Sequence, residues 1–92
     1  MRPLDPGHVI SDVGRRVAEL RRGRDWTQER LAEEAEVSLK YLQRVEAGRE
    51  NLTVQSLVKL ANLLHASMLA FFERPRSRGR PMPGRPPKNK KA

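Results

Sequence analysis

The sequence has no cysteine, only four residues among Trp, Tyr and Phe, and no long hydrophobic run. Without cysteine, neither a disulfide framework nor a thiolate metal site can form. No apolar segment approaches the roughly 20 residues that a membrane-spanning helix needs, and the opening "MRPLDPGHVI" lacks the apolar region of a signal peptide. Because 92 residues suffice for one small core, we expect a single soluble domain in the cytoplasm.

The sequence also offers little for catalysis. Its two histidines, His8 and His65, are far apart, and neither an acidic pair nor a glycine-rich phosphate loop accompanies them. The glutamates between residues 29 and 36 lie broadly opposite the apolar residues of the same segment, as on a solvated helix face. We therefore expect no enzyme activity, no metal ion and no cofactor.

Positive charge is concentrated at the end of the chain. The net charge is +8, of which residues 73–92 carry +7, with eight Lys or Arg residues against the single Glu73. The same segment holds five of the seven prolines. This composition predicts a folded domain over 1–72, a disordered basic tail over 73–92 and a polyanionic partner.

Apolar residues at intervals of three and four predict helices within residues 1–72. The expected helices are 6–22, 28–35 after Thr27, a short one between Ser38 and Gly48, 54–64 after Thr53, and a last one from Ser67. An apolar residue precedes each of the caps Thr27, Ser38 and Thr53 and can contact another five positions later, which is the spacing of a hydrophobic staple. No period-two run occurs here, so the predicted class is all-α with five helices.

The segment "EVSLKYLQRVEAG", residues 36–48, has room for a helix of only about two and a half turns. About three residues separate it from the preceding helix, and so short a connection forces a steep crossing, as in a helix-turn-helix. One side holds Leu42 and Val45, while Lys40, Gln43 and Arg44 fall within about a 100° arc on the other. A solvated helix surface has the same pattern, so the segment alone does not decide whether this face binds anything.

Four short patterns occur in one register: "LR" at Leu20, "TQERLA" at Thr27, "VS..YL.RVE.G" at Val37 and "L.KLA..L" at Leu57. Together they make residues 13–72 resemble the lambda-repressor/Cro-like helix-turn-helix family, also called the xenobiotic-response-element type. Two positions depart from the family pattern, since Glu36 and His65 stand where the family often has glycine. A left-handed backbone at Glu36 would cost about 1 kcal/mol.

The resemblance implies that the short helix enters the major groove of DNA, with base contacts at its start and middle. Here these positions are Leu39, Lys40, Gln43 and Arg44. Lys40 and Arg44 can donate to guanine O6 and N7, and Gln43 can pair with adenine or reach a phosphate. Leu39 can touch a thymine methyl group.

Residues around this helix are expected to contact the DNA backbone. Thr27 and Gln28 stand at the N-terminus of the 28–35 helix, where the helix dipole is positive. Arg49 and Asn51 match family positions that touch the backbone, and Tyr41 is expected as a phosphate contact or a packing residue.

Arg21 falls beside the apolar stripe of the first helix, which is a poor place for an unpaired charge. The family pairs this arginine with the glutamate that ends the short helix, here Glu46, so the resemblance implies a structural ion pair. Trp26 is expected to belong to the core.

The C-terminal part of the domain is more apolar than the family pattern. We predict that Leu63, Leu69 and Phe72 form the two-fold interface of a homodimer. The alternative is that Leu63 packs under the last helix within one chain.

In the tail, Arg-Gly-Arg-Pro at 78–81 and Gly-Arg-Pro at 84–86 resemble the AT-hook. In this interpretation Arg78, Arg80 and Arg85 lie in the minor groove of A·T-rich DNA. The alternative is a non-specific electrostatic tether.

The sequence thus predicts a sequence-specific DNA-binding transcriptional regulator, acting as a dimeric repressor or autoregulator on a palindromic operator. Two alternatives stay open. The first is an antitoxin-type interaction module that binds a protein partner such as a toxin, with DNA binding secondary. The second is an architectural DNA-binding protein.

Overall fold

The computed structural model describes residues 3–77 of the chain. It contains α1 (Pro6–Gly23), α2 (Gln28–Ala35), α3 (Leu39–Glu46), α4 (Val54–Leu64) and the 3-10 helix η1 (Met68–Phe72). No strand occurs in these residues. The all-α class and the four α-helices expected from the sequence are therefore confirmed.

The fifth element differs from the expected α-helix, because Met68–Phe72 forms a 3-10 helix. Ser67 caps its start by accepting from the Ala70 N–H, and the Glu73 N–H closes its end on Ala70 O. The segment is only five residues long, and Pro75 follows closely. A proline disfavours the α conformation in the residue before it, and short terminal turns are commonly 3-10.

Every α-helix begins at a polar residue whose side chain accepts a backbone N–H of the first turn. The caps are Asp5, Thr27, Ser38 and Thr53, with Pro6 at the first position of α1. Trp26, Val37 and Leu52, the apolar residues that precede the last three caps, are half-buried and pack against the core. These contacts fix the angle at which the chain enters each helix.

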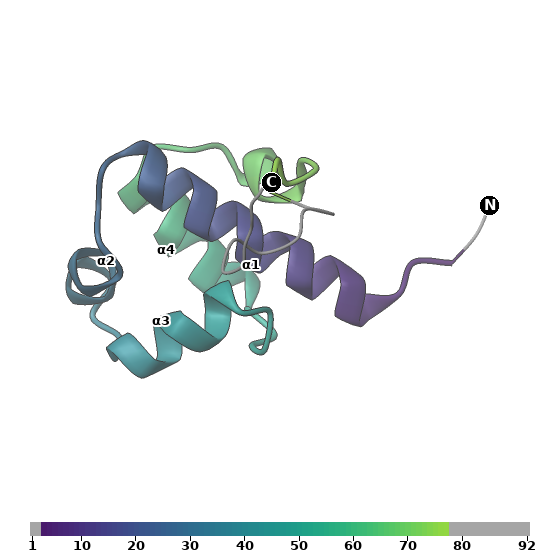
Figure 1. Cartoon of the computed structure of the whole chain (residues 1–92), viewed down its shortest axis with the longest axis horizontal. Helices are drawn as coiled ribbons and strands as arrows, with labels where there is room; N and C mark the ends of the chain where they lie inside the picture. Colours follow the sequence, from purple (N-terminus) through teal and green to yellow (C-terminus); the bar gives the residue numbers. More distant parts are fainter. Residues whose placement is uncertain (1–2, 78–92) are drawn as a thin grey trace, which may run out of the picture.

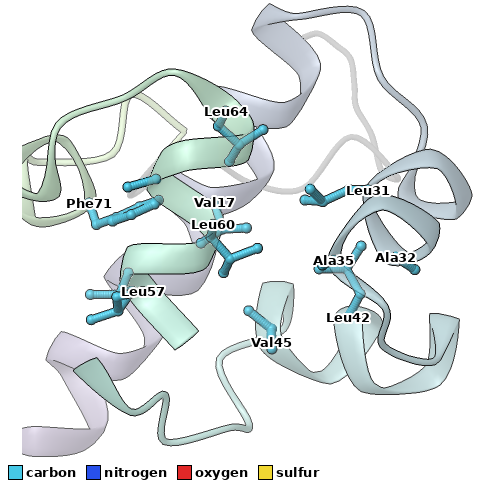
Figure 2. Close-up of a cluster of buried hydrophobic side chains, with 12 residues drawn as sticks. Val17, Leu31, Ala32, Ala35, Leu42, Val45, Leu57, Leu60, Leu64 and Phe71 are labelled. Atoms are coloured by element: carbon cyan, nitrogen blue, oxygen red, sulfur yellow. The ribbon is translucent and has the colours of Figure 1, made fainter. Parts of the chain in front are cut away.

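One hydrophobic core receives side chains from all four α-helices and η1 (Figure 2). Its largest fully buried side chains are Val17, Leu31, Leu42, Val45 and Phe71. α1 crosses the molecule and contacts α3, α4 and η1, while α2 packs on α3 and α4 (Figure 1). α1 is therefore the support against which the short α3 is placed.

α1 and α3 approach each other closely at Gly14. A Cβ atom built there would overlap the carbonyl oxygen of Val45 in α3. A second close contact follows at Gly48, which has φ +77° and whose Cβ would come within 2.8 Å of the Cα of Ser11. Glycine is thus required on both sides of this contact, which sets the position of α3 and of the loop after it.

Three turns within residues 3–77 have a left-handed backbone at a non-glycine residue, which is Asp25, Glu36 or His65. Glu36 at the end of α2 has φ 59°, and His65 at the end of α4 has φ 53°. These are the positions where the sequence departs from the family's glycine. The strain expected for a left-handed Glu36 is therefore present in the folded protein.

The described chain remains in contact with α1 beyond residue 72, the expected limit of the folded domain. The buried Arg16 donates to Ala70 O at 2.7 Å, to Glu19 at 2.9 Å and to Glu73 at 3.1 Å. Ser77 donates both its backbone N–H and its hydroxyl to Glu19, each at 2.8 Å. Residues 73–77 therefore form a strap along α1, which we call the C-terminal strap.

Candidate nucleic-acid interface

α3 lies at the edge of the molecule beside α2, on the side away from η1 (Figure 1). Leu42 and Val45 are each 1% exposed and anchor it to the core. Lys40, Gln43 and Arg44 are exposed, and Leu39 is half-buried at the start of the helix. We call Leu39, Lys40, Gln43 and Arg44 the reading face.

A buried ion pair holds the end of α3. Arg21 Nε and Nη2 donate to the two carboxylate oxygens of Glu46 at 2.8 and 3.1 Å, and Arg21 Nη1 donates to Trp26 O at 2.7 Å. Both side chains of the pair are less than a tenth exposed. The structure therefore contains the ion pair that the resemblance implies. The pair joins three segments, namely α1, α3 and the turn that leads into α2.

The N-terminus of α2 lies next to this pair. Gln28 is half-buried and donates its amide to Glu46 Oε1 at 2.9 Å, which ties α2 to the end of α3. Thr27 is exposed, and its hydroxyl oxygen accepts the Arg30 N–H at 3.0 Å.

The Trp26 ring is half-buried, with the guanidinium groups of Arg24 and Arg30 at 5.2 and 4.5 Å from its centre. Trp26 thus lies at the edge of the core, with two guanidinium groups over its ring.

Three residues expected to contact the DNA backbone, which are Tyr41, Arg49 and Asn51, differ in their exposure. Arg49 and Asn51 are exposed in the loop between α3 and α4. Tyr41 is half-buried and lines a small cavity of about 170 Å³ between α2, α3 and α4. Tyr41 therefore packs against the core, and the exposed part of its side chain remains accessible to the DNA backbone.

Arg44 has a partner that the sequence analysis did not identify. Its Nε donates to Glu50 Oε2 at 2.7 Å, and its Nη2 lies 3.4 Å from Arg49 O.

The role of Arg16 was also not predicted, since its partners Ala70 and Glu73 lie 54 and 57 positions away in the chain. The sequence signal for Arg16 is a charge next to the apolar stripe of α1, the same signal that marked Arg21.

The residues expected at a dimer interface are not equally placed. Leu69 is 77% exposed and Phe72 is 55% exposed, both in η1. Leu63 is half-buried and packs against the core of its own chain. Only part of Leu63 is therefore accessible to a partner.

The tail residues Arg78, Arg80 and Arg85 lie outside the described residues. None of the helices within residues 3–77 has the length and apolar character that crossing a membrane requires. In the same range, no three His, Asp or Glu side chains come together as metal ligands would.

Comparison with protein families matches residues 17–71 to the helix-turn-helix family HTH_3. Among curated protein sequences no match was found. Several solved structures are similar. The restriction-modification controller protein C.AhdI from Aeromonas hydrophila is 30% identical with a TM-score of 0.65, over 68% of this chain and 96% of that one.

Two further structures match at similar levels. The clp gene regulator ClgR from Corynebacterium glutamicum is 27% identical with a TM-score of 0.66, over 77% of this chain and 71% of that one. An HTH_3 family transcriptional regulator from Vibrio cholerae is 29% identical with a TM-score of 0.68, over 74% of this chain but only 38% of that one. With its fold, its turn and the family match over 17–71, the chain belongs to the lambda-repressor/Cro-like HTH_3 family of helix-turn-helix DNA-binding proteins.

Proposed function

We propose that this protein is a transcriptional regulator that recognises a specific DNA sequence with α3 in the major groove. The observation that carries the proposal is the reading face. Long hydrogen-bonding side chains project from a helix whose opposite side is buried and whose position is fixed by Gly14 and the Arg21–Glu46 pair. A rigid helix with such donors can read base edges, which a mobile surface helix does less well.

Lys40 and Arg44 donate to guanine, Gln43 pairs with adenine or reaches a phosphate, and Leu39 makes an apolar contact with a thymine methyl group. Contacts with the DNA backbone orient this helix without reading sequence. We assign them to Thr27, Gln28, Tyr41, Arg49 and Asn51. Gln28 uses one amide hydrogen on Glu46 and keeps the other for a phosphate.

Regulation by this protein is supported by its structural neighbours, among them the controller protein C.AhdI and the clp gene regulator ClgR. We propose a repressor or autoregulator that acts as a homodimer on a palindromic operator. The exposed Leu69 and Phe72, with the accessible part of Leu63, would form the two-fold interface. A dimer sets two recognition helices about one DNA turn apart.

The proposal is tested by selecting binding sites from random-sequence duplexes with the full chain. Lys40→Ala and Arg44→Ala should each weaken binding to the selected operator by about 1–3 kcal/mol and relax the preference at particular base pairs. Glu33→Ala, on the exposed side of α2, is the control and should change neither affinity nor preference. If both reading-face variants select the same sequence with the same affinity as the parent, α3 is not the reader.

A further inference from the structure

Arg44 of the reading face is held by a side chain outside that face. Glu50 lies six positions further along, in the loop between α3 and α4, and its carboxylate accepts Arg44 Nε at 2.7 Å. The pair therefore connects a helix to a loop and is not a pair along one helix surface. The function proposed above uses Arg44 and leaves Glu50 without a role.

The loop that carries Glu50 is itself fixed in place. Gly48 turns the chain in close contact with Ser11 of α1. The Arg49 N–H then donates to Arg44 O at 2.9 Å, which folds the loop back on the end of α3. The Glu50 side chain is only 27% exposed. Its carboxylate is thus placed by backbone contacts with α1 and α3.

The two contacts of Arg44 leave one edge of its guanidinium free to bind DNA. Both involve the Nε and Nη2 side, at Glu50 Oε2 and Arg49 O. An arginine binds guanine O6 and N7 through two parallel N–H donors, which Nη1 and the second hydrogen of Nη2 can supply here. Arg44 can therefore contact a base while its Nε remains on Glu50.

The Glu50 carboxylate also neutralises a positive charge that would otherwise face DNA. A free arginine attracts the phosphates of any sequence, because this attraction depends on charge and not on bases. It also loses rotamer entropy when it is ordered on binding. An arginine that is already paired and oriented attracts phosphates less and has less entropy to lose.

We infer that Glu50 is a specificity-determining positioning residue, which orients Arg44 toward one base pair and reduces its attraction to unrelated DNA. This inference rests on the proposed function, because it needs Arg44 at a base edge. Glu50 acts through Arg44 and has no contact of its own with a base.

The test uses Glu50→Gln in the full chain, which keeps the shape of the side chain and removes its charge. Affinity is measured for the selected operator, for that operator changed at each base pair in turn, and for an unrelated duplex, at several salt concentrations. Glu50→Gln should bind the unrelated duplex more tightly, with a salt dependence steeper by about 0.9 in log K per decade of salt. Discrimination at the base pair read by Arg44 should fall about threefold to tenfold.

Glu34→Gln is the matched control. Glu34 pairs with Arg30 at 3.2 Å on exposed α2, so this variant makes the same charge change and also releases an arginine. It should affect all duplexes alike and leave discrimination unchanged. In an Arg44→Ala background, Glu50→Gln should cause no further loss of discrimination, because the two residues act as one unit. Circular dichroism of each variant checks that the fold is retained.

Three outcomes overturn the inference. If Arg44→Ala changes the preferred base pair but Glu50→Gln behaves as Glu34→Gln does, Glu50 has no part in specificity and the proposed function stands. If Glu50→Gln still lowers discrimination in the Arg44→Ala background, it does not act through Arg44. If neither Lys40→Ala nor Arg44→Ala changes the selected sequence, the proposed function fails and the inference with it.

Discussion

At the level of single residues, the ends of α2 and α4 have an unusual feature. Glu36 and His65 have a left-handed backbone, with φ of 59° and 53°, and both are exposed. Their side chains make the turn more costly than glycine would, because Cβ approaches the following carbonyl oxygen. The turns persist since each closes the end of a helix that is anchored in the core.

We predict that Glu36→Gly and His65→Gly each increase the free energy of unfolding by about 0.5–1 kcal/mol. The measurement is equilibrium denaturation in urea. Glu33→Gly, on the exposed side of α2, serves as the control and should lower stability by a similar amount, because glycine is unfavourable inside a helix. An unfolding midpoint for Glu36→Gly at or below that of the parent would contradict the prediction.

The carboxyl group of Glu19 links the C-terminal strap to pH. Burial raises the pKa of its carboxyl, but hydrogen bonds from the Ser77 N–H and hydroxyl, together with Arg16, outweigh burial and lower the pKa below 4.5. The folded protein therefore binds this proton more weakly than the unfolded chain does. The resulting stability is present above about pH 4.5 and is lost as the pH falls through the lower pKa of the folded state.

The corresponding prediction is that stability falls with pH below 4.5 more steeply in the parent protein than in Glu19→Gln. Glu19→Gln should also be less stable at neutral pH, because Arg16 loses a charged partner. Thermal unfolding between neutral pH and the acid range provides the measurement. Parallel stability profiles for the two proteins would show that Glu19 does not contribute to the acid response.

At the level of elements, α3 is too short to be stable alone, because isolated helices below about 12–15 residues are marginal in water. Its position depends on Leu42 and Val45 in the core, on the Arg21–Glu46 pair and on the glycine contact with α1. Leu42 holds the middle of the helix, and the other three contacts hold its C-terminal end. The geometry of the reading face is therefore set by α1 and α2 as much as by α3.

Gly14→Ala should separate this positioning effect from the chemistry of the reading face. The added methyl group overlaps the Val45 carbonyl, so α3 must move away from α1. We expect a loss of about 1–3 kcal/mol in the free energy of unfolding, together with weaker operator binding although no reading-face residue has changed. Denaturation and a DNA titration measure the two effects.

Gly23→Ala is the matched control, because nothing lies within 4 Å of a Cβ at the end of α1. It should leave stability and DNA binding unchanged or slightly improve stability. If Gly14→Ala matched Gly23→Ala in both measurements, the close approach of α1 and α3 would not position the reading face.

At the level of the whole molecule, the proposed DNA-binding surface and the proposed dimer interface belong to different elements. α3, which carries the reading face, lies below α1 in the view of Figure 1, and η1, which carries the exposed Leu69 and Phe72, lies above it. Exposed apolar residues that lie together often mark an interaction site. This arrangement would leave α3 open to DNA while η1 contacts a second copy of the chain.

We predict that Leu69→Ser combined with Phe72→Ser weakens self-association and, with it, binding to a two-site operator. Sedimentation equilibrium of the free protein and of its operator complex measures both. Val54→Ser is the control, since Val54 is 71% exposed at the start of α4 and lies outside the proposed interface. A parent protein that is monomeric at tens of micromolar, both free and on the operator, would rule out the dimer.

The sequence alone determined the elements that depend on local chemistry. Caps at Thr27, Ser38 and Thr53 and the spacing of apolar residues are properties of neighbouring positions, so the four α-helices and the two sides of α3 could be predicted from them. The Arg21–Glu46 pair could be expected as well, but only from the family resemblance. The sequence predicted a cost at Glu36 only for the case of a left-handed backbone. Whether the backbone is left-handed there depends on how α2 and α3 meet.

The tertiary structure decided what depends on contacts between distant positions. Arg16 with Glu73, and Ser77 with Glu19, join segments more than 50 residues apart, so no local pattern marks the C-terminal strap. Leu63 packs against the core of its own chain, and Met68–Phe72 forms a 3-10 helix, and the periodicity of the sequence reveals neither. Glu50 reaches Arg44 from a loop that Gly48 turns against Ser11, and this contact with α1 is not visible in the local sequence. Side-chain identity is written in the sequence, but which charges meet is fixed by packing, since ion pairs form only between groups that the fold brings within a few ångströms.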